Sequence, residues 1–363
     1  QSNHPGRPYH NRIEVTRWAH NGPAENACVV PGTHGRYCIS PAIPDLAPEP
    51  PHLDVPGKIL VWADLHVHTA YSKCAAANDG TPEENLRFQR DHLGCRVLCL
   101  TEHGHIMSHA EHEHSFDVLQ REAGKDAVAL YASEPLTTGQ DTIFYSLDRQ
   151  VIARFHALSQ VTRNRGGHYQ MVKQHLPPRS LIVARNFHPG DERRKGQPSS
   201  ELIGFDPELE PFMEAQQTRG DNLRLDDVLG PRTVRHFLQA GCKLGLTGGS
   251  DHAMGCGPDH VALTGFWLDE LTPEAVWDAL WHRRTFSVNN AKIALWATLN
   301  DAVLGDTVET GLPLRFRMKA TCPFPLTRFT LTRDGEIIAE SKLDDTTGEC
   351  ELIDDDAHPG PHW

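Results

Sequence analysis

The sequence predicts an α/β protein with a parallel sheet whose faces are covered, followed by a small antiparallel β module. From Lys58 onward, short apolar runs alternate with amphipathic stretches, which is typical of strands alternating with helices. After Lys292 apolar and polar residues alternate, and the Asp-Gly pair at 334 and 335 indicates a hairpin. The residues before Lys58 are rich in Pro, Gly and His without a regular period. We therefore expect three parts: an extended arm at 1–57, a main domain at 58–291 and a β module at 292–363.

Each predicted element has its own local signal. The run KILVWA at 58–63 is apolar and of strand length. The Thr-Pro-Glu-Glu run from Thr81 supplies a helix N-cap, a proline at the first helical position and a capping box, and Gly94 supplies a stop. A second Thr-Pro-Glu run begins a helix at Thr272. Further apolar runs predict strands at 96–101, 127–133, 180–187, 212–218 and 242–247.

The composition is that of an ordinary globular protein and argues against several classes of function. Hydrophobic residues make up 39% and charged residues 23% of the chain, and no apolar run approaches the ~18 residues of a membrane-spanning helix. The net charge of -13 and the lack of a Lys/Arg cluster argue against a nucleic-acid partner. We expect a small-molecule substrate, with neither nucleic acid nor membrane as a partner. The oligomeric state has no signal.

Cysteine usage and the chain ends leave the cellular compartment open. The nine cysteines include no CxxC pair, and Cys95 and Cys99 are expected to be small buried residues of a strand. A bond between Cys28 and Cys38, which flank a Gly/Pro/His segment, would indicate an oxidising environment. The chain begins with Gln1 without a readable signal peptide and stops where another strand could begin. A removed leader and a trimmed β module are both compatible with these ends.

Residues able to bind metal ions follow the predicted strands. The carboxyl ends of parallel strands meet at one edge of a sheet, where loops build sites, so we expect these side chains to lie close together. They are Asp64, His66, His68, Glu102, His103, Glu134, His188, Asp251 and His252.

The first of these strand ends carries a geometric prediction. Because side chains of a strand alternate between its faces, His66 and His68 point to the same side and can reach one ion. Asp64 shares that face and is expected to hold an imidazole N–H. A carboxylate such as Glu134 or Asp251 can bridge two ions, so the pattern predicts a polynuclear site of nitrogen and oxygen donors.

Other histidines carry less weight. Three histidines at 109–114 lie among glutamates, which favours a solvated loop or a helix edge. His168 and His175 remain reserve ligands, and His260 is a candidate substrate contact.

The metal site must supply the reactivity, because the chain has no GxSxG motif, no P-loop and no GxGxxG motif. Bound metal ions lower the pKa of a coordinated water towards 7 and stabilise a developing oxyanion, which predicts hydrolysis. Arg219 follows a predicted strand and is a candidate clamp for an oxyanion or a phosphate, although a surface arginine fits its position equally well.

These motifs resemble those of the polymerase and histidinol phosphatase (PHP) superfamily. The matching segments, within residues 58–291, are DLHVHTAYS, LTEHG, SEP, NFHPGD and GGSDH. Within that superfamily the chain looks most like the branch of carbamate-hydrolase-like metallohydrolases, on the segments ILVWADLHVHT, TPEENLRFQRD, TRGD and ALWHRRTFSV.

The resemblance implies a distorted (β/α)7 TIM-like barrel that holds one to three divalent Zn, Mn or Fe ions in a cleft at the strand ends. The implied metal ligands are His66, His68, His103, Glu134, His188, Asp251 and His252, with Cys74 as a further candidate. Asp64, His103 and Arg219 are the candidate catalytic residues. The implied activity is mainly phosphoester hydrolysis, and for this branch hydrolysis of carbamates and related esters and amides.

Four positions depart from the family's pattern. Glu102 stands where the second motif usually has Asp, and Gln140 stands where relatives often place a histidine. Ala253 occupies the usual place of the last histidine, which here comes one residue earlier. Cys74 stands where members carry Asp or His, so it is either a thiolate ligand that favours a soft ion such as zinc or the mark of a lost metal position.

We therefore expect a metal-dependent hydrolase, with phosphoesters ahead of carboxyl esters, amides and carbamates as substrates. Two hypotheses from other classes stay open. One is a non-catalytic module whose altered site holds metal for stability or partner binding. The other is a secreted adhesin built on the β module.

Overall fold

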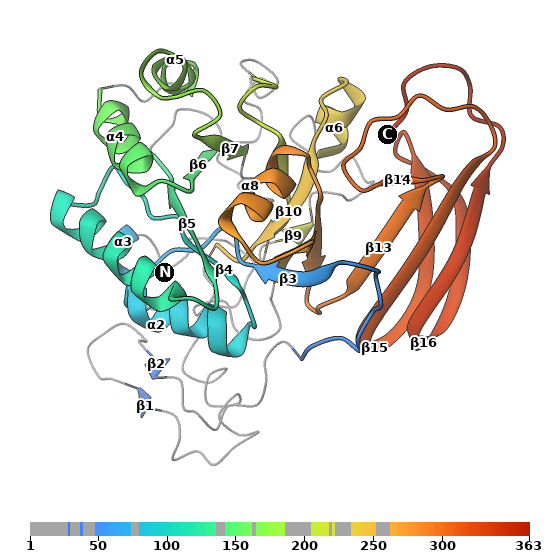
Figure 1. The fold of residues 1–363 in the computed structure, drawn as a ribbon, viewed down its shortest axis with the longest axis horizontal. Helices are drawn as coiled ribbons and strands as arrows, with labels where there is room; N and C mark the ends of the chain where they lie inside the picture. Colours follow the sequence, from blue (N-terminus) through green and yellow to red (C-terminus); the bar gives the residue numbers. More distant parts are fainter. Residues whose placement is uncertain are drawn as a thin grey trace.

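The computed structural model describes residues 48–73, 80–135, 142–161, 165–185, 205–217, 234–251 and 262–363, and the backbone alone at 28–29, 37–38 and 220–221. A sheet curved into a nearly closed barrel forms its main body, with the helices α2 to α5 on one side and a separate antiparallel sheet on the other (Figure 1). The expected fold class, a distorted TIM-like barrel followed by a C-terminal β module, is confirmed. The domain bounds remain predictions.

The six predicted strands of the main domain are present, each within three residues of its expected ends. The barrel strands are β3 (Ile59–Ala63), β4 (Val97–Leu100), β5 (Val128–Ser133), β6 (Thr142–Ser146), β7 (Ile182–Arg185), β8 (Phe212–Gln217), β10 (Gly245–Gly249), β11 (Ala262–Leu268) and β12 (Thr285–Asn289). Their order across the sheet is β10-β8-β7-β6-β5-β4-β3-β11-β12, and the short β9 (Gly220–Asp221) pairs with β8.

The sheet is mixed, so the expectation of a parallel sheet is wrong at three strands. The groups β3-β4-β5 and β7-β8-β10 are parallel, but β6, β11 and β12 run antiparallel to their neighbours. The connection from β5 to β6 spans only 134–141, which is shorter than the roughly dozen residues that a parallel crossover needs. The three antiparallel strands were not predicted.

The helices begin where the capping signals indicate. The side chain of Thr81 accepts the backbone N–H of Glu84 and the side chain of Glu84 accepts that of Thr81, which confirms the capping box of α2 (Pro82–Arg87). A π-helical turn, η4 (Phe88–His92), extends α2, and Gly94 follows with a positive φ of 65°. The side chain of Thr272 caps α8 (Pro273–Trp281) by accepting the backbone N–H of Ala275, without a capping box. The remaining helices are η2 (Ala70–Ser72), α3 (His109–Ala123), α4 (Arg149–Ser159), α5 (Arg165–His175) and α6 (Val234–Gln239). None of the described helices is long and apolar enough to cross a membrane.

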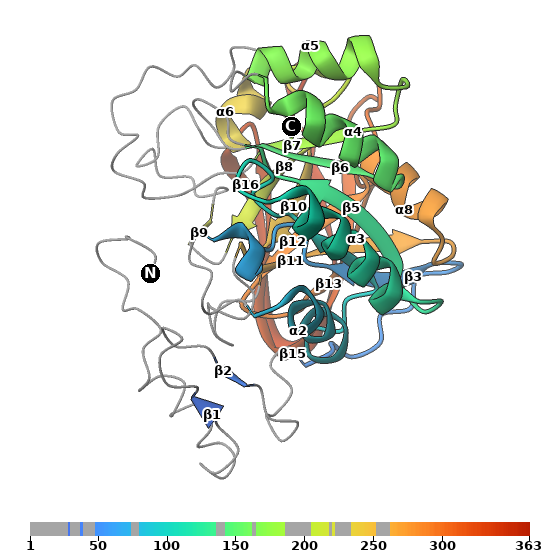
Figure 2. The same ribbon diagram turned by 90° about the vertical axis from the view of Figure 1, so that its left-hand side faces the viewer.

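Alternate residues of the barrel strands belong to two hydrophobic cores. One set packs inside the barrel and against α8, and its members include Val61, Ala63, Val97, Cys99, Leu130, Ala132, Tyr145, Ala184 and Phe212. The other set packs against α3, α4 and α5, which form the arc of helices seen in Figure 2, and includes Trp62, Leu98, Leu100, Tyr131, Phe144 and Val183. The period of two therefore separates interior from exterior positions. Cys95 and Cys99 are buried and free, as expected, but only Cys99 lies in a strand, because β4 begins at Val97.

Two threonine hydroxyls close the barrel by joining the two ends of the strand order. The hydroxyl of Thr264 on β11 accepts the backbone N–H of Gly248 and donates to its carbonyl, each at 2.9 Å. The hydroxyl of Thr285 on β12 donates to the carbonyl of Leu246 at 2.9 Å. These bonds join β10 to the antiparallel pair at the other end of the sheet order.

The C-terminal module is an antiparallel sheet in the order β14-β13-β15-β16. Its strands are β13 (Ala294–Leu299), β14 (Ala302–Val303), β15 (Leu314–Arg333) and β16 (Glu336–Asp354). The predicted hairpin is confirmed, with Asp334 and Gly335 at φ of 53° and 85° between β15 and β16. At 28–29 and 37–38 two strands pair Cys28 opposite Cys38, although the side chains of both cysteines lie outside the described residues.

Candidate metal centre

The segments that follow β3 and β10 form an isolated bridge, Val67 with Asp251, and carry three of the predicted ligands. The backbone N–H of Asp251 donates to the carbonyl of His66 at 2.6 Å, and that of His68 donates to the carbonyl of Asp251 at 3.2 Å. Asp251 has a φ of 66°, which is uncommon for a residue other than glycine and is held here by these bonds. The local backbone therefore places both histidines and Asp251 on one rim of the barrel, at the carboxyl ends of β3 and β10.

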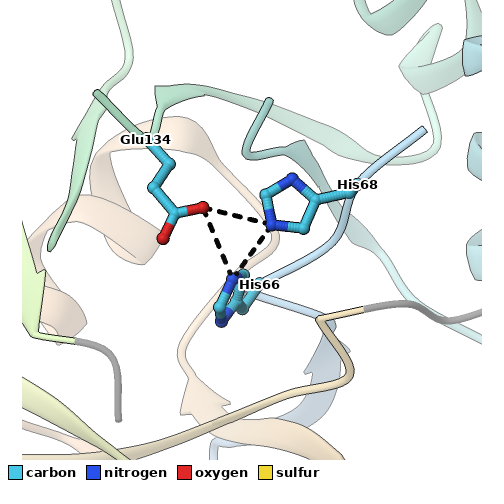
Figure 3. Close-up of side chains that lie close together, drawn as sticks. All are labelled: His66, His68 and Glu134. Atoms are coloured by element: carbon cyan, nitrogen blue, oxygen red, sulfur yellow. Dashed lines mark hydrogen bonds and ion pairs between the residues drawn. The ribbon is translucent and has the colours of Figure 1, made fainter. Parts of the chain in front are cut away.

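Four donor atoms from three strand ends face one another. Nε2 of His66 and Nε2 of His68 are 3.2 Å apart, and Oδ1 of Asp251 lies 3.3 Å from the first and 3.2 Å from the second. Oε2 of Glu134, which follows β5, lies 3.1 Å from Nε2 of His68 and 3.9 Å from Nε2 of His66 (Figure 3). None of the four residues is more than 2% exposed.

The tautomer of His66 follows from its other ring nitrogen. Nδ1 of His66 lies 3.0 Å from Oε1 of Glu214, and an ionised carboxylate can only accept a hydrogen bond. The proton of a neutral His66 therefore resides on Nδ1, and Nε2 presents a lone pair to the cluster.

The tautomer of His68 is determined in the same way, by the hydroxyl of Ser72. Its Nδ1 lies 2.9 Å from Oγ of Ser72, which donates its own proton to Glu102 and accepts the backbone N–H of His103 at 2.8 Å. Because the only proton of Ser72 is committed to Glu102, Nδ1 of His68 must donate to Ser72. Nε2 of His68 therefore presents a lone pair as well.

The four donor atoms of the cluster favour a positive charge between them. Lone pairs of two imidazoles and two carboxylates point at one another in a buried space, which is unfavourable without a cation. Although burial opposes its charged form, the carboxylates of Glu214, Asp251 and Glu134 raise the pKa of His66 to about 9. A proton or a metal ion can supply this positive charge.

The donor set and its spacing fit a divalent metal ion. Ligands at about 2.1 Å from a tetrahedral Zn²⁺ lie about 3.4 Å from one another. The three separations among His66, His68 and Asp251 are 3.2, 3.2 and 3.3 Å. Within the described part of the chain, His66, His68 and Glu134 also form a group whose possible ligand atoms all lie within 4.8 Å. Imidazole and carboxylate donors together suit several divalent ions, including zinc, manganese and iron.

Glu134 also connects the cluster to a third imidazole. Nδ1 of His103 lies 3.1 Å from Oε2 of Glu134, the oxygen that also faces His68. Although burial opposes ionisation, His103 and His68 hold the pKa of Glu134 well below its usual range. The side chain of His103 is 24% exposed and that of Glu134 is 3% exposed, so His103 is the member of this group that faces outward.

Asp64 holds the rim together, and among the described residues its carboxylate binds backbone N–H groups and a hydroxyl rather than the imidazole expected for it. Its Oδ1 accepts the backbone N–H groups of Ser250 at 2.9 Å and His66 at 3.2 Å, and its Oδ2 accepts the hydroxyl of Ser250. Burial raises the pKa of Asp64 to about 7 against the lowering effect of Ser250. A catalytic role for Asp64 stays a prediction.

Three residues that orient the cluster were not predicted for that role: Ser72, Glu102 and Glu214. The signal for Glu214 is that it is the single acidic residue in the strand FMEAQQ. It lies two residues after the inward-facing Phe212 and therefore on the same face of the strand. The sequence marks Glu102 as a strand-end residue able to bind a metal ion and as a departure from the family's Asp. Its longer side chain accepts hydrogen bonds from Ser72 and from the hydroxyl of Thr69.

Several predicted site residues lie outside the described residues: Cys74, His188, Arg219 and His252, and with them Gln140, Ala253 and His260. Their roles stay predictions.

Two other histidines lie in a buried core, and the expectation for one of them is wrong. His112 is not solvated, because it lies on the inner face of α3 with 2% exposure and stacks on His156 of α4 at a ring separation of 4.3 Å. Burial lowers the pKa of His112 to about 3. His168 is fully buried in α5 against aromatic rings of β6 and α4, in the outer core.

No family model matches the sequence, and no curated protein sequence matches it. Among solved structures the chain is similar to a two-domain protein from Bacteroides vulgatus ATCC 8482 that contains a predicted PHP-like metal-dependent phosphoesterase. The TM-score is 0.53 at 15% identity, and the alignment covers 86% of this chain and 91% of that chain. An amidohydrolase from Chromobacterium violaceum gives a TM-score of 0.32 at 13% identity, and the alignment covers 63% of this chain and 99% of that chain. A TM-score this low carries no argument about the fold. The first likeness shows a shared fold.

Proposed function

We propose that this protein is a metal-dependent hydrolase that prefers phosphoesters to carboxyl esters, amides or carbamates. The observation that carries the proposal is the convergence of lone pairs from His66, His68, Glu134 and Asp251 in a buried space at the strand ends. The order of substrate classes is supported by the similar structure, which contains a predicted metal-dependent phosphoesterase.

The residues divide the chemical tasks. His66, His68, Glu134 and Asp251 would hold a divalent ion, which would supply Lewis acidity and lower the pKa of a water bound to it. Glu214 and Ser72 hold the protons of the two imidazoles on Nδ1 and so turn Nε2 to the cluster, and the carboxylates of Glu134 and Asp251 offset the charge of the ion. His103 is exposed enough to meet a substrate and contacts Glu134, so we assign it the proton delivered to the leaving group.

The test combines metal content with turnover. Purified protein is analysed for bound metal, then loaded with Mn²⁺, Fe²⁺ or Zn²⁺ and assayed on chromogenic phosphomonoesters, phosphodiesters, carboxyl esters and carbamates. We expect bound metal and the highest kcat/KM on a phosphoester, with turnover lost in His66→Ala and retained in Glu122→Gln, a change in the α3 ion pairs with Arg87 and Arg90. Metal-loaded protein that hydrolyses none of these substrates would favour the alternative, a non-catalytic metal-binding module.

A further inference from the structure

A buried carboxylate stands directly behind one of the proposed metal ligands. Glu214 belongs to β8 and points into the barrel on the same side as Phe212. It is 4% exposed, its Oε1 lies 3.0 Å from Nδ1 of His66, and Gln217 donates to its Oε2 at 3.3 Å. The strand therefore delivers a negative charge to the ring nitrogen of His66 that faces away from the cluster.

Gly249 on β10 makes room for this contact. A Cβ at position 249 would lie 2.3 Å from Cβ of His66 and 2.9 Å from Oε1 of Glu214, which are separations that real Cβ atoms do not show. Any side chain there would push His66 and Glu214 apart. The pair thus depends on a glycine from a third strand.

The other nearby carboxylates cannot take this role. Asp64 is engaged by Ser250, while Glu134 and Asp251 face Nε2 of His66. Within the described part of the chain, Glu214 is the carboxylate that contacts Nδ1.

We propose that Glu214 is a positioning residue of the metal centre, which holds the proton of His66 on Nδ1, fixes the ring with Nε2 towards the ion and strengthens Nε2 as a donor. A carboxylate behind a metal-bound imidazole has these effects, and its loss typically weakens metal binding about 10- to 100-fold. This inference rests on the proposed function, because it requires His66 to bind a divalent ion.

The experiment is a Co²⁺ and Zn²⁺ titration of the full chain, with a competing chelator, for wild type, Glu214→Gln and Glu214→Ala. We expect affinity to fall about 10- to 100-fold, less for Gln than for Ala because an amide oxygen can still accept from Nδ1. The visible absorption of bound Co²⁺ should also change, because the donor strength and direction of His66 change. Gly249→Ala acts on the same contact from the other side and should weaken binding too.

A merely structural role predicts a different pattern, which melting temperatures measured with and without Zn²⁺ would show. Positioning reduces the increase in Tm that Zn²⁺ causes, whereas a structural role lowers the Tm of the metal-free protein and leaves that increase intact. Glu122→Gln, which loses ion pairs in α3, serves as the matched control with unchanged metal affinity. Wild-type affinity and an unchanged Co²⁺ spectrum in both Glu214 variants would overturn this inference alone. A wild-type protein that binds neither ion would overturn the proposed function as well.

Discussion

The carboxylate of Asp64 binds Ser250, a residue 186 positions further along the chain, through both the backbone N–H at 2.9 Å and the hydroxyl. Asp64 lies two residues before His66, and Ser250 directly precedes Asp251. The contact therefore ties together the two strand ends that carry these proposed ligands.

This tie predicts unequal effects of two substitutions. Asp64→Ala leaves the buried N–H groups of Ser250 and His66 without an acceptor, and each such loss costs about 1–3 kcal/mol of unfolding free energy. Asp64→Asn keeps an oxygen at the Oδ1 position, so we expect a much smaller loss. Urea unfolding of the metal-free variants measures the difference. Equal stability of the two variants would show that the hydrogen bonds of Asp64 do not hold the rim.

The extra methylene of Glu102 gives a second prediction. Glu102 accepts from the hydroxyls of Thr69 and Ser72 and from the backbone N–H of Thr69 at 3.2 Å, and Glu102→Asp withdraws its carboxylate by about 1.5 Å. The hydroxyl of Ser72 is then free to donate to Nδ1 of His68, which moves the proton of His68 to Nε2.

We expect Glu102→Asp to weaken Zn²⁺ binding about tenfold or more, measured by chelator competition. Glu111→Asp is the control, because Glu111 belongs to the capping box of α3 and makes no contact with the cluster. Unchanged affinity in Glu102→Asp would contradict the assignment of the His68 tautomer.

The hydroxyls of Thr264 and Thr285, which close the barrel, give a third prediction. Thr264→Val removes the hydroxyl that satisfies both backbone groups of Gly248, and the expected loss is about 1–3 kcal/mol of unfolding free energy. Thr142→Val is a matched control, because the hydroxyl of Thr142 is buried without a hydrogen-bond partner among the described residues. Thermal and urea unfolding should show a loss for the first variant and none for the second. A larger loss of stability in Thr142→Val than in Thr264→Val would mean that the Thr264 hydroxyl does not stabilise the barrel.

His112 gives a prediction about pH. Burial, reinforced by His156, His109 and Arg149, lowers the pKa of His112 to about 3, compared with 6.5 in an unfolded chain. Between these values the unfolded state binds a proton that the folded state does not, so stability falls as pH falls, by up to about 1.4 kcal/mol per pH unit.

His112→Phe keeps a planar ring against His156 and removes this titration. Unfolding free energies between pH 6.5 and 4, measured in chelator so that metal release does not contribute, should fall less steeply in the variant than in wild type. Identical slopes would indicate that protons enter the wild-type fold without opening the contact between α3 and α4.

Much of the architecture was predictable because its signals are local. The capping box at Thr81, the hairpin at Asp334 and Gly335 and the six apolar strands depend on residues close together in the chain, and all are present. The antiparallel direction of β6, β11 and β12 has no local signal, because it depends on the strands to which they are hydrogen-bonded.

The sequence by itself determined that imidazoles and carboxylates would follow the strands, since His66 and His68 share a face through the period of two and Glu134 and Asp251 end their own runs. Only the tertiary structure decided which groups orient them. Glu214 lies 148 residues from His66, and Ser250 lies 186 residues from Asp64. Such contacts depend on strand order, register and barrel closure, which bring distant side chains within 3 Å of each other, and no spacing within one segment records them.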